Sequence, residues 1–524
     1  MAEKKPTTGQ NAIHFGTDGW RALLDKDFNL ETLGQVTAAT GQAFRQLRET
    51  APTSLKSVAD AIPEIDRRAN TLIVGYDCRR QAGQYAAFVA SILADQGFEV
   101  IVSDRYCPTP ALCWTISRRP EALGGIMLTS SHNAAEYLGV KLRMNDGGAS
   151  PAWFTDQVES LLSADQHRGF AQAAQAFAAA VNGTPDSPAR TLPGATWRYA
   201  DLMSAYLADL ATLVQAEVIR TAQLAVVVDP LYGAGRGYLA GLLREMGVQV
   251  TEIHGENDPT FGGLHPEPIL PWVAAGAAKV VELGAAAVLI NDGDADRIGA
   301  IDGLGNYVSS HRIISLLIAH LVEDRGLTGR VVRTSAGSNL IKRQCQRLGL
   351  ELVTRPIGFK WVYQEMLRGD VLIGGEESGG FGLPSHVRER DGLLMALLLV
   401  EMMAMRHQTL VELVQGLLAE LGNLEYARQD LPLSAEQQAT FLARHVRVPG
   451  TAIQPYEALF APLGEQLVEL ERTDGIMLRL ASDAWLLVRP SGTEPLVRVY
   501  AEATSSERVQ QLLEIGCNLA QGQL

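Results

Sequence analysis

The chain has few of the features that mark secreted, membrane-spanning or disulfide-built proteins. It has five cysteines in 524 residues, scattered and without a Cys-x-x-Cys pair: Cys78, Cys107, Cys113, Cys345 and Cys517. This pattern favours reduced thiols in a cytosol. The longest uncharged apolar run, Leu393 to Val400, is too short to cross a bilayer. The first residues are polar and lack the apolar core of a signal peptide. We therefore expect a cytoplasmic protein with no membrane partner.

The chain also has fewer basic than acidic residues. The sequence holds 45 Lys and Arg against 59 Asp and Glu, which gives a formal net charge of −14. Such a balance argues against a nucleic-acid or anionic-membrane partner. An anionic small-molecule substrate would need a local basic pocket. The hydrophobic content of 47% is ordinary for a globular protein, and the length predicts three or four domains.

An internal repeat predicts the architecture. Three times an apolar strand is followed by a helical stretch that ends at a glycine, and a second strand begins at once. The units start at Leu72, Leu224 and Val331, and their glycines are Gly97, Gly247 and Gly349. A glycine in that position is typical of a left-handed helix cap. Strand–helix–strand units build α/β layers, so we predict three related α/β domains with mixed sheets.

The domain boundaries follow from breaks in this pattern. Residues 182–194 are rich in Pro and Gly and predict a linker. Residues 51–70 predict a polar insertion within the first domain, and a further break falls near residues 302–305. Past about Leu421 the pattern becomes a smaller α+β domain. We predict an α/β domain I at 1–190, domain II at 191–305, domain III at 306–420 and a C-terminal α+β domain at 421–524, arranged around a central cleft.

One short stretch carries the clearest chemistry. An apolar strand, residues 285–290, runs directly into Asp292, Asp294 and Asp296. Three carboxylates at alternate positions repel one another, and a hard divalent cation such as Mg²⁺ or Ca²⁺ offsets that repulsion with oxygen ligands. The EF-hand spacing does not fit, since its glycine and glutamate positions are Arg297 and Gly303. A haloacid-dehalogenase-type phosphatase, with Asp292 as nucleophile, is the alternative.

Two further stretches offer a nucleophile and hydroxyl-binding groups. Ser130 and Ser131 precede His132 after an apolar strand, so a serine there could act as a nucleophile with a neighbouring base. Residues 374–380, Gly-Gly-Glu-Glu-Ser-Gly-Gly, surround two acids and a hydroxyl with glycines. Carboxylates and hydroxyls suit the vicinal hydroxyls of a sugar, and glycines allow close approach of the backbone.

The stretch between residues 487 and 498 reads as a phosphate-binding loop. It offers the guanidinium groups of Arg489 and Arg498, the hydroxyls of Ser491 and Thr493, and backbone amides freed by Gly492. Charge-assisted forks and an amide nest are the groups that bind phosphate oxygens.

Taken together, five motifs in order resemble the α-D-phosphohexomutases, the family of phosphoglucomutase and phosphomannomutase. The motifs are Phe15–Arg21, Thr129–Asn133, Asp292–Arg297, Gly375–Gly380 and Arg489–Pro495. Relative to the family's Thr-Ala-Ser-His-Asn-Pro loop, this chain has Ser130 for Ala and Ala134 for Pro, and the register places the phosphorylated serine at Ser131.

The resemblance implies a reaction and a role for each group. Phosphorylated Ser131, held on one Mg²⁺ with Asp292, Asp294 and Asp296, would exchange its phosphoryl group with a hexose phosphate through a hexose 1,6-bisphosphate, which also serves as primer. The other groups that it implies are Arg21 and Lys141 near the reacting groups, His132 or Lys360 as general acid or base, and Arg297, Glu376, Ser378, Arg489, Ser491, Gly492, Thr493 and Arg498 for substrate binding.

The expected substrates are small hexose phosphates, with glucose favoured and mannose also accepted, in a monomer or homodimer. A phosphomannomutase or phosphoglucosamine mutase remains the nearest alternative. A phosphatase using Asp292, or a silent sugar-phosphate sensor, is the alternative from another class.

Overall fold

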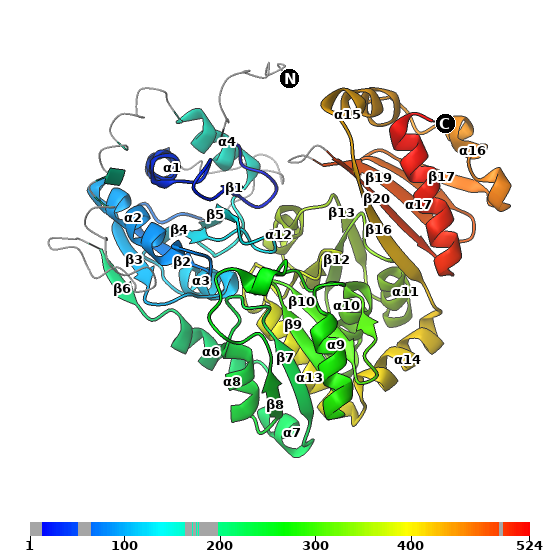
Figure 1. Ribbon diagram of the computed structural model, residues 1–524, viewed down its shortest axis with the longest axis horizontal. Coiled ribbons are helices and arrows are strands. Elements are labelled where there is room, and N and C mark those ends of the chain that lie inside the picture. The colour runs from blue at the N-terminus through cyan, green and yellow to red at the C-terminus, as the bar shows by residue number, and fades with distance from the viewer. Residues whose placement is uncertain are drawn as a thin grey trace.

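Four β-sheets follow one another along the chain, and each forms the centre of one domain (Figure 1). The computed structural model describes residues 13–50, 64–162, 170, 174–175, 177, 197–491 and 496–523. The predicted linker 182–194 and most of the insertion 51–70 lie outside this range. The N-terminal and C-terminal sheets lie on opposite sides of the molecule, and the second and third join them (Figure 1).

The first three sheets share one arrangement, which confirms the repeat. In each, three parallel strands are followed by an antiparallel fourth strand, and the first of the parallel strands lies between the other two. The matching orders are β3-β2-β4-β5, β8-β7-β9-β10 and β13-β12-β14-β15. The glycines that close the repeated helices have positive φ, with 88° at Gly97, 84° at Gly247 and 67° at Gly349. These left-handed positions are open to glycine at no steric cost.

The first sheet has six strands and is packed between helices. Its domain contains β1 (Trp20–Leu23), α1 (Leu30–Thr50), β2 (Thr71–Tyr76), α2 (Ala82–Asp95), β3 (Glu99–Ser103), α3 (Thr109–Ser117), β4 (Ala122–Leu128), β5 (Tyr137–Met144), α4 (Ala152–Ser160) and β6 (Arg198–Ala200). Strand β6 pairs in parallel with β3. The first sheet therefore includes residues beyond the boundary that we predicted after residue 190.

The second sheet has five strands. Its domain contains α6 (Met203–Thr212), α7 (Ala216–Thr221), β7 (Ala225–Asp229), α8 (Tyr238–Glu245), β8 (Gln249–Glu252), the short helix η3 (Phe261–Gly263), α9 (Ala274–Leu283), β9 (Ala287–Asn291), β10 (Ile298–Asp302) and β11 (Tyr307–Val308). The predicted break at residues 302–305 is the turn between β10 and β11, which are antiparallel partners. The second sheet thus ends just after the predicted boundary at residue 305.

The third sheet has four strands and is followed by two helices. Its domain contains α10 (Ser310–Ala319), η4 (His320–Asp324), β12 (Arg330–Thr334), α11 (Asn339–Leu348), β13 (Leu352–Arg355), α12 (Phe359–Arg368), β14 (Val371–Gly375), β15 (Phe381–Gly382), α13 (Gly392–Arg406) and α14 (Leu410–Leu421). The apolar run that begins at Leu393 lies on α13, whose residues are buried on every side. A helix that is apolar all round belongs in a core.

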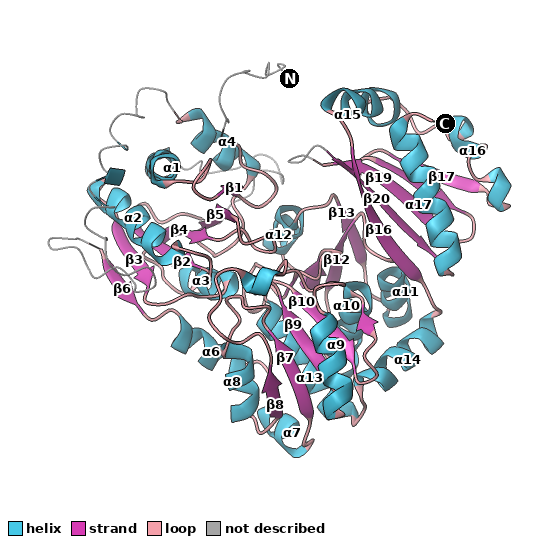
Figure 2. Cartoon of the chain, in the orientation of Figure 1, coloured by secondary structure: helices cyan, strands magenta, loops and turns pink. Residues whose placement is uncertain are grey.

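The fourth sheet is antiparallel throughout, and α17 packs across one of its faces (Figure 2). This domain contains β16 (Glu425–Pro432), α15 (Ala435–Phe441), η5 (Leu442–Val446), α16 (Gln454–Glu457), η6 (Ala461–Leu463), β17 (Leu467–Glu471), β18 (Ile476–Leu480), β19 (Trp485–Pro490), β20 (Leu496–Ala503) and α17 (Ser506–Gln521). The predicted smaller α+β domain is confirmed.

Hydrophobic burial separates the fourth domain from the other three. The largest core cluster runs through the first three domains, from Ile73 to Leu424, and a separate cluster from Leu433 to Ala520 lies within the fourth. Among the described residues no single helix is long and apolar enough to cross a membrane; the bent pair α13 and α14, at 84° to each other, passes a test of length and composition alone.

Candidate active site

The three polar loops occupy the same place in the repeat. Each is the hairpin that joins the third parallel strand to the antiparallel fourth: residues 129–136 between β4 and β5, 292–297 between β9 and β10, and 376–380 between β14 and β15. Because ligands of α/β sheets bind beyond the carboxyl ends of the strands, one structural position supplies the serine loop, the aspartate loop and the sugar loop.

The serine loop is held in an uncommon backbone conformation. Ser131 has φ of 51°, a value that residues other than glycine seldom adopt without outside support. Arg79 supplies that support, since its Nη2 donates to the carbonyl oxygens of Ser131 at 2.7 Å and Asn133 at 2.6 Å. Its Nη1 donates to the carbonyl oxygen of Ala134 at 2.7 Å. One buried guanidinium therefore fixes the course of this loop.

A second set of hydrogen bonds fixes the amide of Ser131. The Ser131 amide donates to Thr129 Oγ1 at 2.8 Å, and that hydroxyl donates to Asp77 Oδ2 at 2.6 Å. Asp77 in turn accepts from Arg79 Nε at 3.1 Å. All of these side chains are buried. The Ser131 hydroxyl is thus presented by a rigid support, whereas Ser130 Oγ is buried with no hydrogen-bond partner among the described residues.

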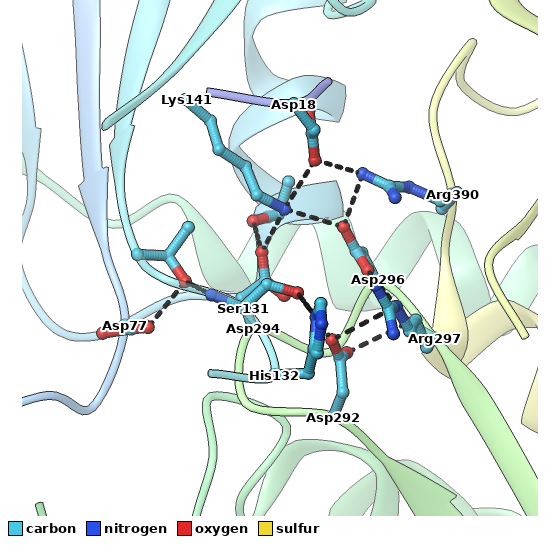
Figure 3. A network of polar contacts seen from close by, with 12 residues as sticks. Asp18, Asp77, Ser131, His132, Lys141, Asp292, Asp294, Asp296, Arg297 and Arg390 are labelled. Atoms are coloured by element: carbon cyan, nitrogen blue, oxygen red, sulfur yellow. Dashed lines mark hydrogen bonds and ion pairs between the residues drawn. The ribbon is translucent and has the colours of Figure 1, made fainter. Parts of the chain in front are cut away.

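The aspartate loop meets the serine loop directly (Figure 3). Ser131 Oγ donates to Asp292 Oδ2 at 2.9 Å. Gly293 makes this approach possible, because a Cβ added there would lie 2.4 Å from the Ser131 carbonyl oxygen. The glycine in Asp-Gly-Asp is therefore required for the two hairpins to touch.

The three aspartates have the arrangement of a cation site. Asp292, Asp294 and Asp296 are buried, and one carboxylate oxygen from each lies within 4.8 Å of the others. Oδ1 of Asp294 and Oδ1 of Asp296 are buried acceptors without a donor among the described residues. Unsatisfied carboxylate oxygens that converge are the ligands that Mg²⁺ prefers. The donor set fits a hard divalent cation.

Charge is unevenly distributed over this loop. Burial, with repulsion from Asp296 and Asp294, holds the pKa of Asp292 well above its ordinary value. Burial also acts on Asp294, but the charge and hydrogen bond of Lys141 outweigh it and lower that pKa. Lys141 Nζ lies 2.7 Å from Asp294 Oδ2 and 2.9 Å from Asp296 Oδ2. The ammonium group is thus part of the aspartate cluster.

His132 lies beside the Ser131 hydroxyl and is itself influenced by several cations. His132 Nδ1 lies 3.3 Å from Ser131 Oγ. Burial lowers the His132 pKa well below its ordinary value, and Arg297, Arg21 and Lys141 lower it further. Arg21 donates to Asn133 Oδ1 at 2.6 Å, and Arg297 Nη1 lies 3.5 Å from Glu267. This positive surrounding favours an anionic group on or beside the serine.

The sugar loop points its acid toward the same centre. Burial raises the pKa of Glu376 to about 7 in spite of Arg390, whose Nη1 lies 3.2 Å from Glu376 Oε2. Ser378 Oγ is buried with no hydrogen-bond partner among the described residues. A buried carboxyl group and an unsatisfied hydroxyl are suited to binding polar hydroxyl groups.

A cavity of about 440 Å³ brings the remaining candidates together. It is lined by the N-terminal loop near Asp18, by Lys360 and Trp361 of α12, and by Asp474 and Arg489 of the fourth domain. Arg489 Nε donates to Asp474 Oδ1 at 2.8 Å, and burial lowers the pKa of Lys360. Lys360 and Arg489 thus share one cavity between three domains.

The rest of the phosphate-loop motif is only partly described. Arg498 Nε lies 3.8 Å from Asp430, and β19 and β20 pair Arg489 directly with Arg498. Side chains paired in this way share one face of the sheet. Ser491 also has a polar partner. Gly492 and Thr493 lie outside the described residues.

Sequence reasoning missed several residues that shape this site. Asp77, Arg79, Thr109 and Arg390 lie outside the five motifs, yet Arg79 holds the serine loop and Thr109 donates from its amide and its hydroxyl to Asp294. The sequence gives only a weak local sign of these residues. Polar side chains stand directly after β2 and at the start of α3, and ligand-binding groups of α/β sheets commonly lie beyond such strand ends.

Comparison with known proteins agrees with the fold. The chain matches models of the phosphoglucomutase/phosphomannomutase α/β/α domain I at residues 48–168, domain II at 204–305, domain III at 309–421 and the C-terminal domain at 447–515. It is 29% identical to the phosphoglucomutase/phosphomannomutase of Thermococcus kodakarensis over 507 residues, covering 96% of this chain and 98% of that one.

Two further matches extend the comparison. The phosphoglucosamine mutase of a Synechococcus species is 30% identical over 445 residues, covering 84% of this chain and 85% of that one. A solved structure from Thermus thermophilus, described as a candidate phosphomannomutase, superposes with a TM-score of 0.77 at 31% identity, covering 98% of this chain and all of that one.

These matches first define the class of enzyme. It is a phosphohexomutase, an isomerase-class enzyme that transfers a phosphoryl group on a small sugar phosphate. More particularly, the chain belongs to the phosphoglucomutase/phosphomannomutase family. The resemblance read from the five motifs is confirmed, and so is the fold that it implied.

Proposed function

We propose that this enzyme interconverts hexose 1-phosphates and hexose 6-phosphates by way of phosphorylated Ser131, with glucose preferred and mannose accepted. The observation that carries the proposal is the Ser131 hydroxyl, held at positive φ and donating at 2.9 Å to a buried three-aspartate loop. A rigidly presented hydroxyl among cations and metal-type ligands is suited to carrying a phosphoryl group.

In the first half-reaction the Ser131 O–P bond breaks and a bond forms between the phosphorus and a hydroxyl oxygen of the bound hexose phosphate. The proton of that hydroxyl passes to a neighbouring base, for which His132 and Lys360 are the candidates. The product is a hexose 1,6-bisphosphate. In the second half-reaction the bisphosphate, turned over in the cleft, returns its other phosphoryl group to Ser131.

Asp292, Asp294 and Asp296, with an oxygen of the Ser131 side chain, are the residues that would hold one Mg²⁺. When bound, this cation would offset the negative charge that develops on the transferring phosphoryl group. Lys141 contacts Asp294 and Asp296, and Arg297 Nε lies 3.8 Å from Asp292 Oδ2, so these two cations would help to orient the carboxylates. Arg21 holds the serine loop through Asn133. Thr109 keeps Asp294 in place from the start of α3.

The phosphate that does not react would bind in the cavity that the fourth domain shares with the first and third. Arg489 lines that cavity with Lys360, and Arg498 lies beside Arg489 on the neighbouring strand. We assign Ser491, Gly492 and Thr493 to the same phosphate by their motif. Asp474 accepts from Arg489 Nε and so would orient the guanidinium toward that phosphate.

The proposed use of both glucose and mannose rests on the sugar loop. An intermediate that binds in two opposed orientations is recognised by groups that occupy similar places in both, which on a hexopyranose are the 3- and 4-hydroxyls. Glu376 and Ser378 would bind these hydroxyls. Glucose and mannose share them and differ at C2, whereas galactose is inverted at C4. A site built to bind a hydroxyl rejects a sugar that misplaces it.

Two serine variants and a sugar panel test the proposal. Ser131→Ala should abolish isomerisation with little loss of stability, while Ser130→Ala should keep most of the activity. Mass spectrometry of the wild type should map a phosphate to Ser131. Galactose 1-phosphate should have a much lower kcat/KM than mannose 1-phosphate. An active Ser131→Ala enzyme would disprove the phosphoserine, and equal use of galactose and mannose would disprove the role of the sugar loop.

A further inference from the structure

One arginine outside all five motifs, Arg390, contacts the loops of three domains; Figure 3 shows its contacts with Asp18 and Asp296. Arg390 lies between β15 and α13, and its side chain is only 5% exposed. Its Nη2 lies 2.5 Å from Asp18 Oδ2 and 2.9 Å from Asp296 Oδ2. Its Nη1 lies 3.2 Å from Glu376 Oε2, and its Nε lies 3.0 Å from Glu389 Oε1. One guanidinium thus contacts the N-terminal loop, the aspartate loop and the sugar loop.

The surroundings of Arg390 are shaped to hold it. The ring of Phe359 lies 5.2 Å from the guanidinium carbon, in the position of a cation–π contact. Gly380 leaves room for the stem, because a Cβ added there would lie 2.3 Å from Arg390 Cδ. The final glycine of the sugar loop therefore leaves the space that the Arg390 side chain occupies. Contacts with Phe359 and with the carboxylates hold the guanidinium in place.

Arg390 and Lys141 hold the same two carboxylates. Asp18 Oδ2 lies 3.0 Å from Lys141 Nζ, and Asp296 Oδ2 lies 2.9 Å from it. Arg390 Nη2 contacts the same two oxygen atoms. The four groups form a ring of alternating charge, which leaves Asp296 Oδ1 as the buried oxygen directed elsewhere.

We propose that Arg390 is a positioning residue that couples the sugar loop to the aspartate loop. Through Nη2 it fixes which oxygen of Asp296 is available to a divalent cation, and through Nη1 it fixes the carboxylate of Glu376 that meets the sugar. Arg390 does not touch the reacting atoms. The inference rests on the proposed function for the roles of Glu376 and Asp296.

The planar fork of arginine is essential to this role. Asp296 and Glu376 are held by different terminal nitrogens of one rigid group. A lysine would keep the charge, and its ammonium can meet several acids as Lys141 does, but one nitrogen cannot occupy the separate positions of Nη1 and Nη2 that hold Glu376 and Asp296 here. The coupling should therefore be lost in Arg390→Lys even though the net charge is unchanged.

A double-mutant cycle measures the coupling. We would compare wild type, Arg390→Lys, Glu376→Gln and the double variant for kcat and KM with glucose 1-phosphate. Loss of a residue that orients metal or substrate ligands lowers activity or metal affinity by roughly 10- to 100-fold. We expect Arg390→Lys to lower kcat/KM in that range, and Glu376→Gln to cost much less in the Arg390→Lys background than in wild type.

A second readout does not depend on turnover. Titration calorimetry with Mg²⁺ alone should show that Arg390→Lys binds the cation about tenfold more weakly than wild type. Phe359→Leu keeps the guanidinium but removes its stacking face, and should give a smaller loss of the same kind. Arg388→Lys is the matched control: this neighbouring side chain is 40% exposed and pairs with Asp146, so both readouts should stay within about twofold of wild type.

The outcomes separate the inference from the proposed function. Additive effects in the cycle together with unchanged Mg²⁺ affinity, in an Arg390→Lys protein that melts like wild type, would overturn the role of Arg390. A wild type that fails to isomerise any hexose phosphate would overturn the proposed function instead. In that case the Mg²⁺ titration of Arg390→Lys still decides whether Arg390 positions Asp296.

Discussion

Glu376 illustrates how a residue of this site is placed at a cost to stability. Its pKa in the folded protein is raised to about 7, chiefly by burial. Between its ordinary pKa and about 7, the folded protein keeps a proton that the unfolded chain has released. Stability therefore falls as pH rises through this window and stays lower above it. A shift of this size corresponds to about 3 kcal/mol at pH 8.

Replacing Glu376 by the neutral glutamine should remove this loss of folding stability. We expect Glu376→Gln to raise the melting temperature at pH 8 and to change it little at pH 5, because the penalty on the charged form is removed. Activity should fall, and the rise of kcat/KM around pH 7 that we expect of the wild type should be absent from the variant. Thermal melts and pH–rate profiles of both proteins check this. A variant less stable than wild type at pH 8 would contradict the assignment.

The functional elements of this fold are hairpins rather than whole domains. Each of the first three sheets contributes the turn after its third parallel strand, so the repeat brings three chemically different loops to one centre. The close approach of two of these turns depends on Gly293, whose missing side chain leaves space for the Ser131 carbonyl oxygen.

This contact gives a prediction with a matched control. Gly293→Ala should separate the serine and aspartate loops and lower kcat by about 100-fold or more, since small displacements of reacting groups cost that much. Gly416→Ala adds the same methyl group within helix α14, where nothing lies within 4 Å of the new carbon. It should keep full activity and gain about 0.5–1 kcal/mol of stability. Equal kinetics for the two variants would show that the loops tolerate the added atom.

The sequence predicts these elements well and their connections poorly. The repeat and the loop motifs are local patterns, because strand period, helix-capping glycines and clustered acids all lie within a few residues of one another. Arg390 and Arg79 could not be found in this way. Their roles come from contacts with segments far away in the chain, such as Arg390 with Asp18 and Arg79 with Asn133, and no local pattern encodes those partners.

At the scale of the whole molecule, the fourth domain is joined to the other three mainly by polar contacts. Asp474 accepts from the amide of Ile357 at 2.7 Å, and Glu502 accepts from the amide of Asn339 at 2.8 Å. Only a small apolar cluster, which includes Ala336 and Trp485, crosses the boundary among the described residues. Interfaces of this kind between domains commonly allow relative motion.

The division of the core then predicts the behaviour of a truncated protein. The core cluster of the first three domains ends at Leu424, one residue before β16, so a chain of residues 1–424 should keep its fold. It retains Ser131, the three aspartates and Arg390, and should therefore bind Mg²⁺ with nearly wild-type affinity. It lacks Arg489 and Arg498, so the non-reacting phosphate would lose its anchor. Since positioning supplies a large part of such a rate enhancement, isomerisation should fall by about 1,000-fold or more.

Two measurements on this truncated chain separate folding from function. Circular dichroism and Mg²⁺ calorimetry should resemble those of the full chain, while turnover of glucose 1-phosphate should be almost absent. Arg489→Met in the full-length protein should reproduce the kinetic part through a higher KM, because it removes one phosphate contact and leaves the domain in place. A truncated protein that isomerises at a rate close to that of the full chain would place the phosphate anchor within the first three domains, and Arg489 would then have no part in binding substrate.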